Sequence, residues 1–349
     1  PMVGRIEAHV SGQVPLSPDE VGEVVEELGI SSDDFVKLQA AWGPALWPNL
    51  LQIGRERKDM SIRLLAGSLT DYRRATDGWW FTVSREVDHY LKSDLFYRPV
   101  YFVSSNTHSL VNLLGGYARS IEPLLAEFLE RTNPENLWYH YQRLKTREAG
   151  DRLHELLYYA LSKYLRDGSK SEQAEKQEAM HSFHRECGIF HVENPLYLDV
   201  AAQVIELRSL CLEALDPRLD VEGFETLTAS NAVIFNVDYP LGMAAYHIFS
   251  QVAANLGELQ GVYVMGKAAT LNGQVGDVMI PNVVYDEHSQ NTFLFRNSFA
   301  AADVAPYLTH GSVFDNQKAV TVRGTFLQNK DFVGVFYKEG YTDIEMEAG

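Results

Sequence analysis

Residues 262–281 read VYVMGKAATLNGQVGDVMIP, two apolar runs separated by small and polar residues. The first run stops at Gly266, and the second begins after Asp277. Short apolar runs bounded by glycine are typical of buried strands, and small residues at the carboxyl end of a strand let a flat or anionic ligand approach the main chain. The alternative for Gly266 and Lys267 is a tight turn with a solvated lysine. The spacing of a Walker phosphate loop is absent.

Strands and helices alternate on both sides of this stretch. The patterns predict a strand at 232–237, a helix at 240–257, two strands within 276–297, and further strands at 318–328 and 332–347. Such alternation predicts an α/β fold with a mostly parallel or mixed sheet that helices cover on both faces. Ligands of these sheets gather at the carboxyl ends of the strands.

Helices are predicted for most of the first half of the chain. Ser17 before Pro18 is typical of a helix start, and Gly29 is typical of its end. The exception is the β-rich run at 100–103, which precedes small polar residues and a new helix start. We therefore expect an N-terminal helical region at 1–93 and an α/β domain at 94–349, with a helical insertion at 117–225.

The composition is that of a folded protein without nucleic-acid affinity. The chain has 349 residues, of which 46% are apolar, enough for one large core or two smaller ones. Its net charge of -17 would repel a phosphate backbone, although a local site for one small anion remains compatible with it. Cys187 and Cys211 are the only cysteines and no zinc-type spacing occurs, so we expect no metal site and a cytoplasmic location. No apolar run approaches the roughly 18 residues of a membrane-spanning helix, so we expect no membrane contact.

The stretch 266–281 resembles the glycine-rich segment of the nucleoside phosphorylase and nucleosidase superfamily. In that segment a G-[ST]-x-G-G-L pattern is followed by V-G-D-[IV]. The matching residues here are Gly266, Leu271, Val275, Gly276 and Asp277, and the departures are Lys267, Ala269 and Thr270. The resemblance implies that Gly266 and Ala268 border the base of a nucleoside.

A second stretch, residues 323–349, resembles a later segment of the same superfamily, which ends in an E-M-E-A signature. Phe326 matches the aromatic residue that stacks on the base, and Leu327 matches the residue whose main chain reads the base edge. Met346 and Glu347 match the pair beneath the ribose. A carboxylate can accept two hydrogen bonds from a vicinal diol, and these strengthen as positive charge grows on the sugar. The alternatives are a solvated strand end for Glu347 and a core position for Met346.

The order of the elements makes residues 99–110 the best candidate for the first strand of the superfamily. The loop after this strand would bring Ser104, Ser105, Asn106 and Thr107 beside a phosphate or an attacking water. His108 would orient the nucleophile or contact the sugar; the alternative is an incidental histidine in a helix cap. Lys267 and Arg323 are the candidate cations for a free phosphate or a 5'-phosphate ester. They favour a nucleotide substrate, for which the AMP nucleosidases are the nearest comparison.

The resemblance implies a phosphorylase-like α/β fold with large helical additions. It also implies cleavage of the N-glycosidic bond of a purine nucleoside or nucleotide by a hydrolase or a phosphorylase. His108 and Glu347 are then the catalytic candidates. No cofactor is expected beyond inorganic phosphate as a co-substrate, and the protein is expected to be a homo-oligomer. The general acid of the superfamily, an aspartate on a later strand, is not matched before Gly349, so we expect that part of the domain to be missing from this chain.

Two other functions fit the same sequence. One is a regulatory or scaffold protein that binds a nucleotide without cleaving it, which the unmatched acid and the departures at Ala269 and Thr270 motivate. The other is a structural helical protein whose sheet retains the motifs. The enzymatic interpretation requires that Gly266, Phe326 and Glu347 meet at one cavity.

Overall fold

The computed structural model describes residues 2–55, 69–146, 150–193, 196–219, 223–308, 310–322 and 330–346. The chain divides into two compact units, residues 1–64 and 65–349. This division lies before the predicted boundary at residue 93, because helix α5 (Leu69–Leu91) packs with the sheet of the second unit through Trp79 and Val83.

The first unit is helical, as the sequence predicts for this part of the chain. Its helices are α1 (Met2–Val10), α2 (Pro18–Leu28), α3 (Ser32–Trp42) and α4 (Leu46–Arg55), with the 3-10 helix η1 (Gly43–Ala45). Ser17 caps α2 in a reciprocal capping box with Glu20, and Gly29 ends it with φ 64°. The predicted start and stop of this helix are therefore confirmed. Ile6, Val24 and Leu46 lie in the small apolar core of the unit.

The second unit contains both helices and strands. Its remaining helices are α6 (Ser109–Gly115), α7 (Tyr117–Ser120), α8 (Glu122–Thr132), α9 (Leu137–Thr146), α10 (Gly150–Tyr164), α11 (Lys170–Glu186), α12 (Met243–Ala254), α13 (Ala301–Val304) and α14 (Lys330–Lys338). Its strands are β1 (Pro99–Ser105), β2 (Ile189–Val192), β3 (Ala202–Glu206), β4 (Val233–Asp238), β5 (Glu258–Val264), β6 (Ala269–Thr270), β7 (Val278–Asp286), β8 (Asn291–Leu294), β9 (Val313–Thr321) and β10 (Asp343–Glu345). Short 3-10 helices are η2 (Leu95–Tyr97), η3 (Pro134–Asn136), η4 (Leu207–Ser209), η5 (Leu212–Ala214), η6 (Pro217–Leu219), η7 (Phe224–Ala229) and η8 (Ala305–Tyr307).

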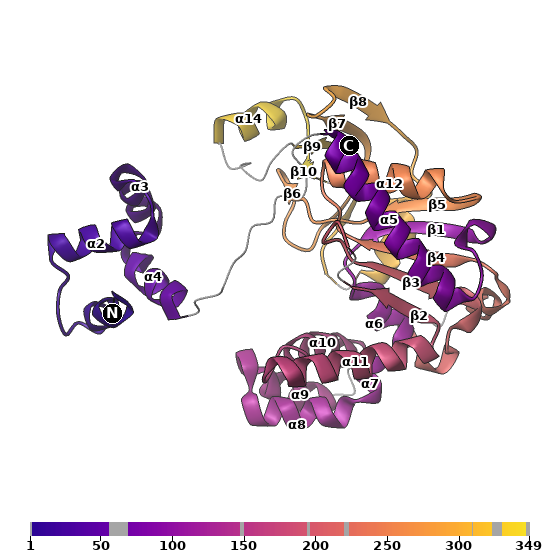
Figure 1. Cartoon of the computed structure of the whole chain (residues 1–349), viewed down its shortest axis with the longest axis horizontal. Coiled ribbons are helices and arrows are strands. Elements are labelled where there is room, and N and C mark those ends of the chain that lie inside the picture. The colour runs from indigo at the N-terminus through magenta and orange to yellow at the C-terminus, as the bar shows by residue number, and fades with distance from the viewer. Residues whose placement is uncertain are drawn as a thin grey trace. The chain divides into compact units, whose positions relative to one another are not determined.

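Five strands form a first mixed sheet, sheet A, in the order β2-β3-β4-β1-β5. β1 is parallel to β4 and β5, whereas β3 is antiparallel to β4 and to β2. α5 and α12 lie together on one face, where Phe102 and Phe235 join the largest core (Figure 1). The opposite face packs Ile205 and Ile234 with Val111 of α6. The prediction of an α/β fold with helices on both faces of a sheet is confirmed for sheet A.

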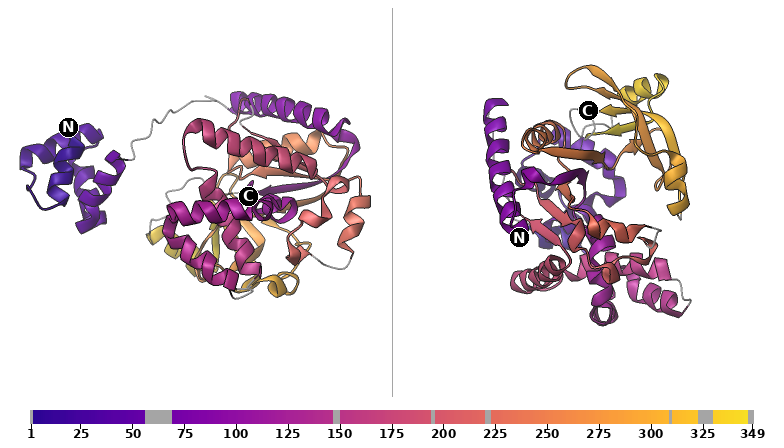
Figure 2. Two further views of the ribbon diagram at one scale, coloured as in Figure 1. Left: turned by 90° about the horizontal axis from the view of Figure 1, so that it is seen from below. Right: turned by 90° about the vertical axis from the view of Figure 1, so that its right-hand side faces the viewer.

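Helices α7–α11 form a group with a core of its own, built around Leu125, Leu129 and Leu157. α11 joins this group to sheet A through contacts with β2 and α6. The right-hand view in Figure 2 separates α5, in dark purple, from the magenta helices of this group.

The predicted helical insertion at 117–225 is wrong beyond α11. Strands β2 and β3 lie in that range and belong to sheet A. These strands are only four and five residues long and both contain polar residues, and periodicity does not separate such short strands from helix segments.

The second sheet, sheet B, has the order β6-β10-β9-β7-β8. β10, β9 and β7 are parallel neighbours, and β6 and β8 pair antiparallel at the edges. The strands predicted within 276–297 are confirmed as β7 and β8. The strand predicted at 332–347 is partly wrong, because 330–338 form helix α14, in which Val333 and Phe336 share one apolar side.

No helix in the described ranges combines the length and the apolar character needed to cross a membrane.

Candidate functional site

The parallel strands of sheet A bring three loops to one edge. β1, β4 and β5 end there at Ser105, Asp238 and Val264. Main-chain hydrogen bonds join the loops: the N–H of Tyr239 donates to the carbonyl of Ser105 at 3.2 Å, and the N–H of Met265 donates to the carbonyl of Ser104 at 2.8 Å. The loop of Ser104–Thr107 and the loop of Gly266 are therefore neighbours.

A cavity of about 500 Å³ lies between β5 and sheet B, and we call it the glycine-loop cavity. Gly266, Lys267 and Ala268 border it on one side, and Asp343 and Glu345 of β10 border it on the other. The structure thus brings the predicted glycine-rich stretch next to the strand that leads into the E-M-E-A signature.

Asp343 is a buried carboxyl group at this cavity, with 2% of its surface exposed. Its Oδ2 accepts a hydrogen bond from the Thr342 hydroxyl at 3.1 Å, while its Oδ1 has no partner among the described residues. Burial raises the pKa of Asp343 to about 6, with Glu345 adding to the rise and the Thr342 hydroxyl opposing it. A carboxyl group with this pKa can donate a proton near neutral pH.

Asp343 is not predicted to be the acid from the sequence, because it precedes the E-M-E-A signature and does not match the aspartate of the superfamily. The E-M-E-A signature begins at Glu345 and does not include position 343. The side chain of Asp343 is buried only because β10 pairs between β6 and β9. A buried acid in an otherwise ordinary strand leaves no signal in the local sequence.

Met346 joins the end of β10 to the loop after β4. Its carbonyl accepts the N–H of Gly242 at 2.6 Å, and its side chain packs beside Val320 and Ile344. The preceding Glu345 accepts a hydrogen bond from the hydroxyl of Thr321. Met346 therefore packs in an apolar cluster, as in its alternative interpretation, and it is not among the residues that line the glycine-loop cavity. Its predicted role beneath the ribose stays a prediction.

Four predicted site residues lie outside the described residues: Arg323, Phe326, Leu327 and Glu347. Their predicted roles at the base, the ribose and the phosphate stay predictions.

The main-chain N–H groups of the loop after β1 already donate to side chains of the protein. Oδ1 of Asn106 accepts the N–H groups of His108 and Ser109 at 3.0 and 2.6 Å, and the carboxylate of Asp238 accepts the N–H of Thr107. The hydroxyl of Ser105 donates to Asn236 at 2.9 Å. An anion beside this loop would therefore meet side chains, because these N–H groups already have partners.

His108 lies among three charged groups from different elements. Burial lowers its pKa; the carboxylate of Asp238 opposes this, and the positive charges of Lys267 and Arg166 add to it. Lys267 comes from the glycine-rich loop and Arg166 from the helical group, so both cations lie within electrostatic reach of the same imidazole. This arrangement favours an anionic ligand near His108.

A second cavity, of about 520 Å³, lies between sheet A and the helical group, and we call it the insertion cavity. Its border includes Thr107, His108, Arg166, His184, His191 and Gln203. This cavity is not predictable from the local sequence, since residues from four separate segments of the chain form it.

A row of polar side chains crosses the same face of sheet A, and we call Ser105, Asn236, Gln203 and His191 the polar rung. Gln203 lies directly opposite Asn236 on β4 and opposite His191 on β2. Asn236 Nδ2 donates to Gln203 Oε1 at 3.0 Å, and Gln203 Nε2 lies 3.0 Å from His191 Nδ1 and donates to the Thr107 carbonyl at 2.6 Å. The rung links the loop after β1 to the insertion cavity.

The motif residues Gly276 and Asp277 fix a turn. Gly276 has φ 101°, and the carboxylate of Asp277 accepts the N–H groups of Gln274 and Ser312 at 2.7 and 2.8 Å. This part of the glycine-rich pattern shapes the loop and does not line the glycine-loop cavity.

The described part of the chain holds no group of three or more His, Cys, Asp or Glu side chains suited to a metal ion. A family model, described as a family of unknown function (DUF6909), matches residues 2–349. The chain belongs to the DUF6909 family. No curated protein matches this DUF6909 chain.

Proposed function

We propose that this DUF6909 protein binds a purine nucleoside or nucleotide in the glycine-loop cavity and cleaves its N-glycosidic bond, with water or phosphate as the nucleophile. One observation carries the proposal: Gly266–Ala268 and Asp343–Glu345, far apart in the sequence, border a single cavity. These are the two stretches that resemble the nucleoside phosphorylase and nucleosidase superfamily. The mixed α/β architecture of the second unit is compatible with a fold of that type, which we include in the proposal.

The size and lining of the cavity support a ligand of this class. A volume of about 500 Å³ lies in the range of small-molecule sites. Val262, Tyr263 and Phe299 supply apolar surface for a flat base, and Tyr263 and Phe299 lie parallel with ring centroids 6.5 Å apart. Lys267 supplies a positive charge for a phosphate ester.

Asp343 is the proposed proton donor. In the hydrolytic form of the reaction, the oxygen of water bonds to C1' of the ribose as the bond from C1' to the base nitrogen breaks. The electron pair of that bond stays with the base, which takes the proton of Asp343, and the proton released by water restores the acid. Its buried, partnerless Oδ1 and raised pKa support this role.

The test is release of free base from AMP, GMP, adenosine and inosine, measured by chromatography with and without inorganic phosphate. We expect release from at least one of them. Asp343→Asn should lower kcat by about 100-fold or more, because general acid catalysis contributes on that scale. Asp199→Asn is the matched control, since Asp199 is exposed and lies outside both cavities.

Absence of base release from all four compounds would exclude the proposed reaction for purine substrates. If Asp343→Asn releases the base as fast as the wild type, Asp343 is not the proton donor. Calorimetric binding of AMP that Lys267→Gln weakens, without any turnover, would instead support the nucleotide-binding alternative.

A further inference from the structure

The insertion cavity combines apolar walls with polar groups at its border and its floor. Val111, Leu161, Leu165 and Met180 line it together with the polar residues named above. Gln203 and His184, both at its border, are 1% and 3% exposed. A space of about 520 Å³ with this mixture is typical of sites for small organic molecules.

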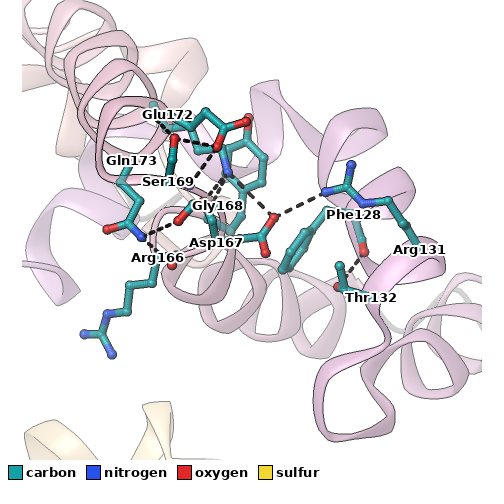
Figure 3. A network of polar contacts seen from close by, with 11 residues as sticks. Phe128, Arg131, Thr132, Arg166, Asp167, Gly168, Ser169, Glu172 and Gln173 are labelled. Atoms are coloured by element: carbon teal, nitrogen blue, oxygen red, sulfur yellow. Dashed lines mark hydrogen bonds and ion pairs between the residues drawn. The ribbon is translucent and has the colours of Figure 1, made fainter. Parts of the chain in front are cut away.

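Arg166 reaches this cavity from the turn between α10 and α11. Gln173 Nε2 donates to the carbonyls of Arg166 and Gly168, each at 2.9 Å, and Lys176 Nζ donates to the carbonyl of Asp167 at 2.8 Å. Figure 3 shows the contacts of Gln173 with the main chain of the turn, and the guanidinium of Arg166 points away from them. The main chain is thus held in place while the charged end has no ion-pair partner among the described residues.

In the part of the chain that the structure describes, other exposed arginines, such as Arg143, also lack an ion pair, and Arg166 differs from Arg143 in that it lines the insertion cavity. The opposite charge at this cavity is Glu193, which already faces His181, with Glu193 Oε1 and His181 Nε2 3.2 Å apart. Arg166 is therefore available to an outside anion.

A neutral imidazole, that of His184, lies at the border of the cavity. Gln203 donates through Nε2 to Nδ1 of His191, so His191 carries its proton on Nε2. His191 Nε2 lies 3.0 Å from Nδ1 of His184, so His184 carries its proton on Nε2, where no described residue accepts it. Burial, followed by the charge of His181, lowers the pKa of His184 to about 4, so this imidazole is neutral at pH 7.

We propose that the insertion cavity is a second binding site, for a phosphomonoester with an uncharged, hydrogen-bonding body such as a nucleoside. Arg166 and His108 would bind the phosphate, because a phosphate presents three acceptor oxygens to donors from several directions. The Nε2–H of His184 would bind an uncharged acceptor on the body, and the apolar walls would cover its remaining surface. Inorganic phosphate alone would leave most of the cavity empty.

This site is separate from the glycine-loop cavity and does not depend on cleavage of a glycosidic bond. The polar rung joins its floor to Ser105 and to the Thr107 carbonyl. A ligand in the insertion cavity would therefore hold the loop that carries His108, which gives the helical group a role in controlling that loop.

The experiment is titration calorimetry of the full chain with AMP, adenosine and inorganic phosphate. We expect AMP to bind at least about tenfold more tightly than adenosine or phosphate. Arg166→Gln should reduce the affinity for AMP by about tenfold or more, the scale of a lost hydrogen bond to a charged group, and leave that for adenosine unchanged. Arg143→Gln is the matched control, because Arg143 is an exposed arginine of the same helical group outside the cavity.

A spectroscopic measurement locates the ligand. In protein labelled with ¹⁵N-histidine, AMP should shift the imidazole signals of His184 and His191 in the wild type, and about tenfold more AMP should be needed for the same shift in Arg166→Gln. Loss of AMP binding with Lys267→Gln but not with Arg166→Gln would place the phosphate in the glycine-loop cavity and overturn the proposal. Failure of all three compounds to bind, or histidine signals that AMP leaves unmoved, would overturn it as well.

Discussion

Replacing Asp343 with asparagine should stabilise the second unit, and the gain should grow with pH. The carboxyl group has a pKa of about 6 in the folded protein against an ordinary value of 3.8, so the folded state binds its proton more tightly than the unfolded state. Stability is therefore lost as the pH rises from about 4 through about 6, and the loss is complete above that range. This difference in pKa of about 2 corresponds to about 3 kcal/mol of unfolding free energy, because a change of one in pKa is worth about 1.36 kcal/mol. Asparagine cannot ionise and removes this loss.

The assay is differential scanning calorimetry between pH 3.5 and pH 8, following the transition of the larger unit. The variant and the wild type should melt together at pH 3.5. At pH 8 the variant should gain about 3 kcal/mol, roughly 5 °C for a unit of this size. Asp199→Asn, at an exposed position, should show no such pH dependence. A constant difference at every pH, or a variant that loses stability above pH 6, would refute the assignment of a buried, protonated carboxyl group.

Three further substitutions test the packing, each by thermal denaturation. Gln203→Leu should destabilise by about 3 kcal/mol, because it removes the hydrogen bonds of a side chain that is 1% exposed and leaves His191 and other groups without partners. Gly311→Ala should cost about 2 kcal/mol or more, because Gly311 has φ 83° and a Cβ there would lie 2.2 Å from the carbonyl oxygen of Gly276. Gly334→Ala in α14 should instead stabilise by about 0.5–1 kcal/mol, since nothing lies within 4 Å of its added Cβ; a loss there would contradict the helix.

Local signals in the sequence were enough to predict several elements. Ser17 and Gly29 mark the ends of α2 through capping and a left-handed turn, which depend on adjacent residues alone. The strand, helix and strand that lead to Gly266 follow from apolar runs of different period and are found as β4, α12 and β5. The neighbouring positions of the Ser104 and Gly266 loops follow from the parallel pairing of β1 and β5.

Features that depend on distant segments were not predicted. β2 and β3 are short strands whose character becomes clear only when they pair with β4. Gln203 and Asn236 are polar residues between apolar neighbours in their strands, and their hydrogen bond depends on the cross-strand register. Arg166 belongs to a polar turn, and only the packing of the helical group brings it to a cavity.

The polar rung makes misaligned pairing of the strands of sheet A less stable than the native pairing. Neighbouring side chains of a strand point to opposite faces, so a slip of one residue between β3 and β4 would turn the amide of Gln203 or Asn236 toward Trp80 and Phe102. Burying an amide there without a hydrogen bond costs about 1–3 kcal/mol of folding free energy. An apolar side chain that moves to the other face loses far less folding free energy. The hydrogen bonds of the polar rung across these four strands therefore form in the native register, and a one-residue slip breaks them.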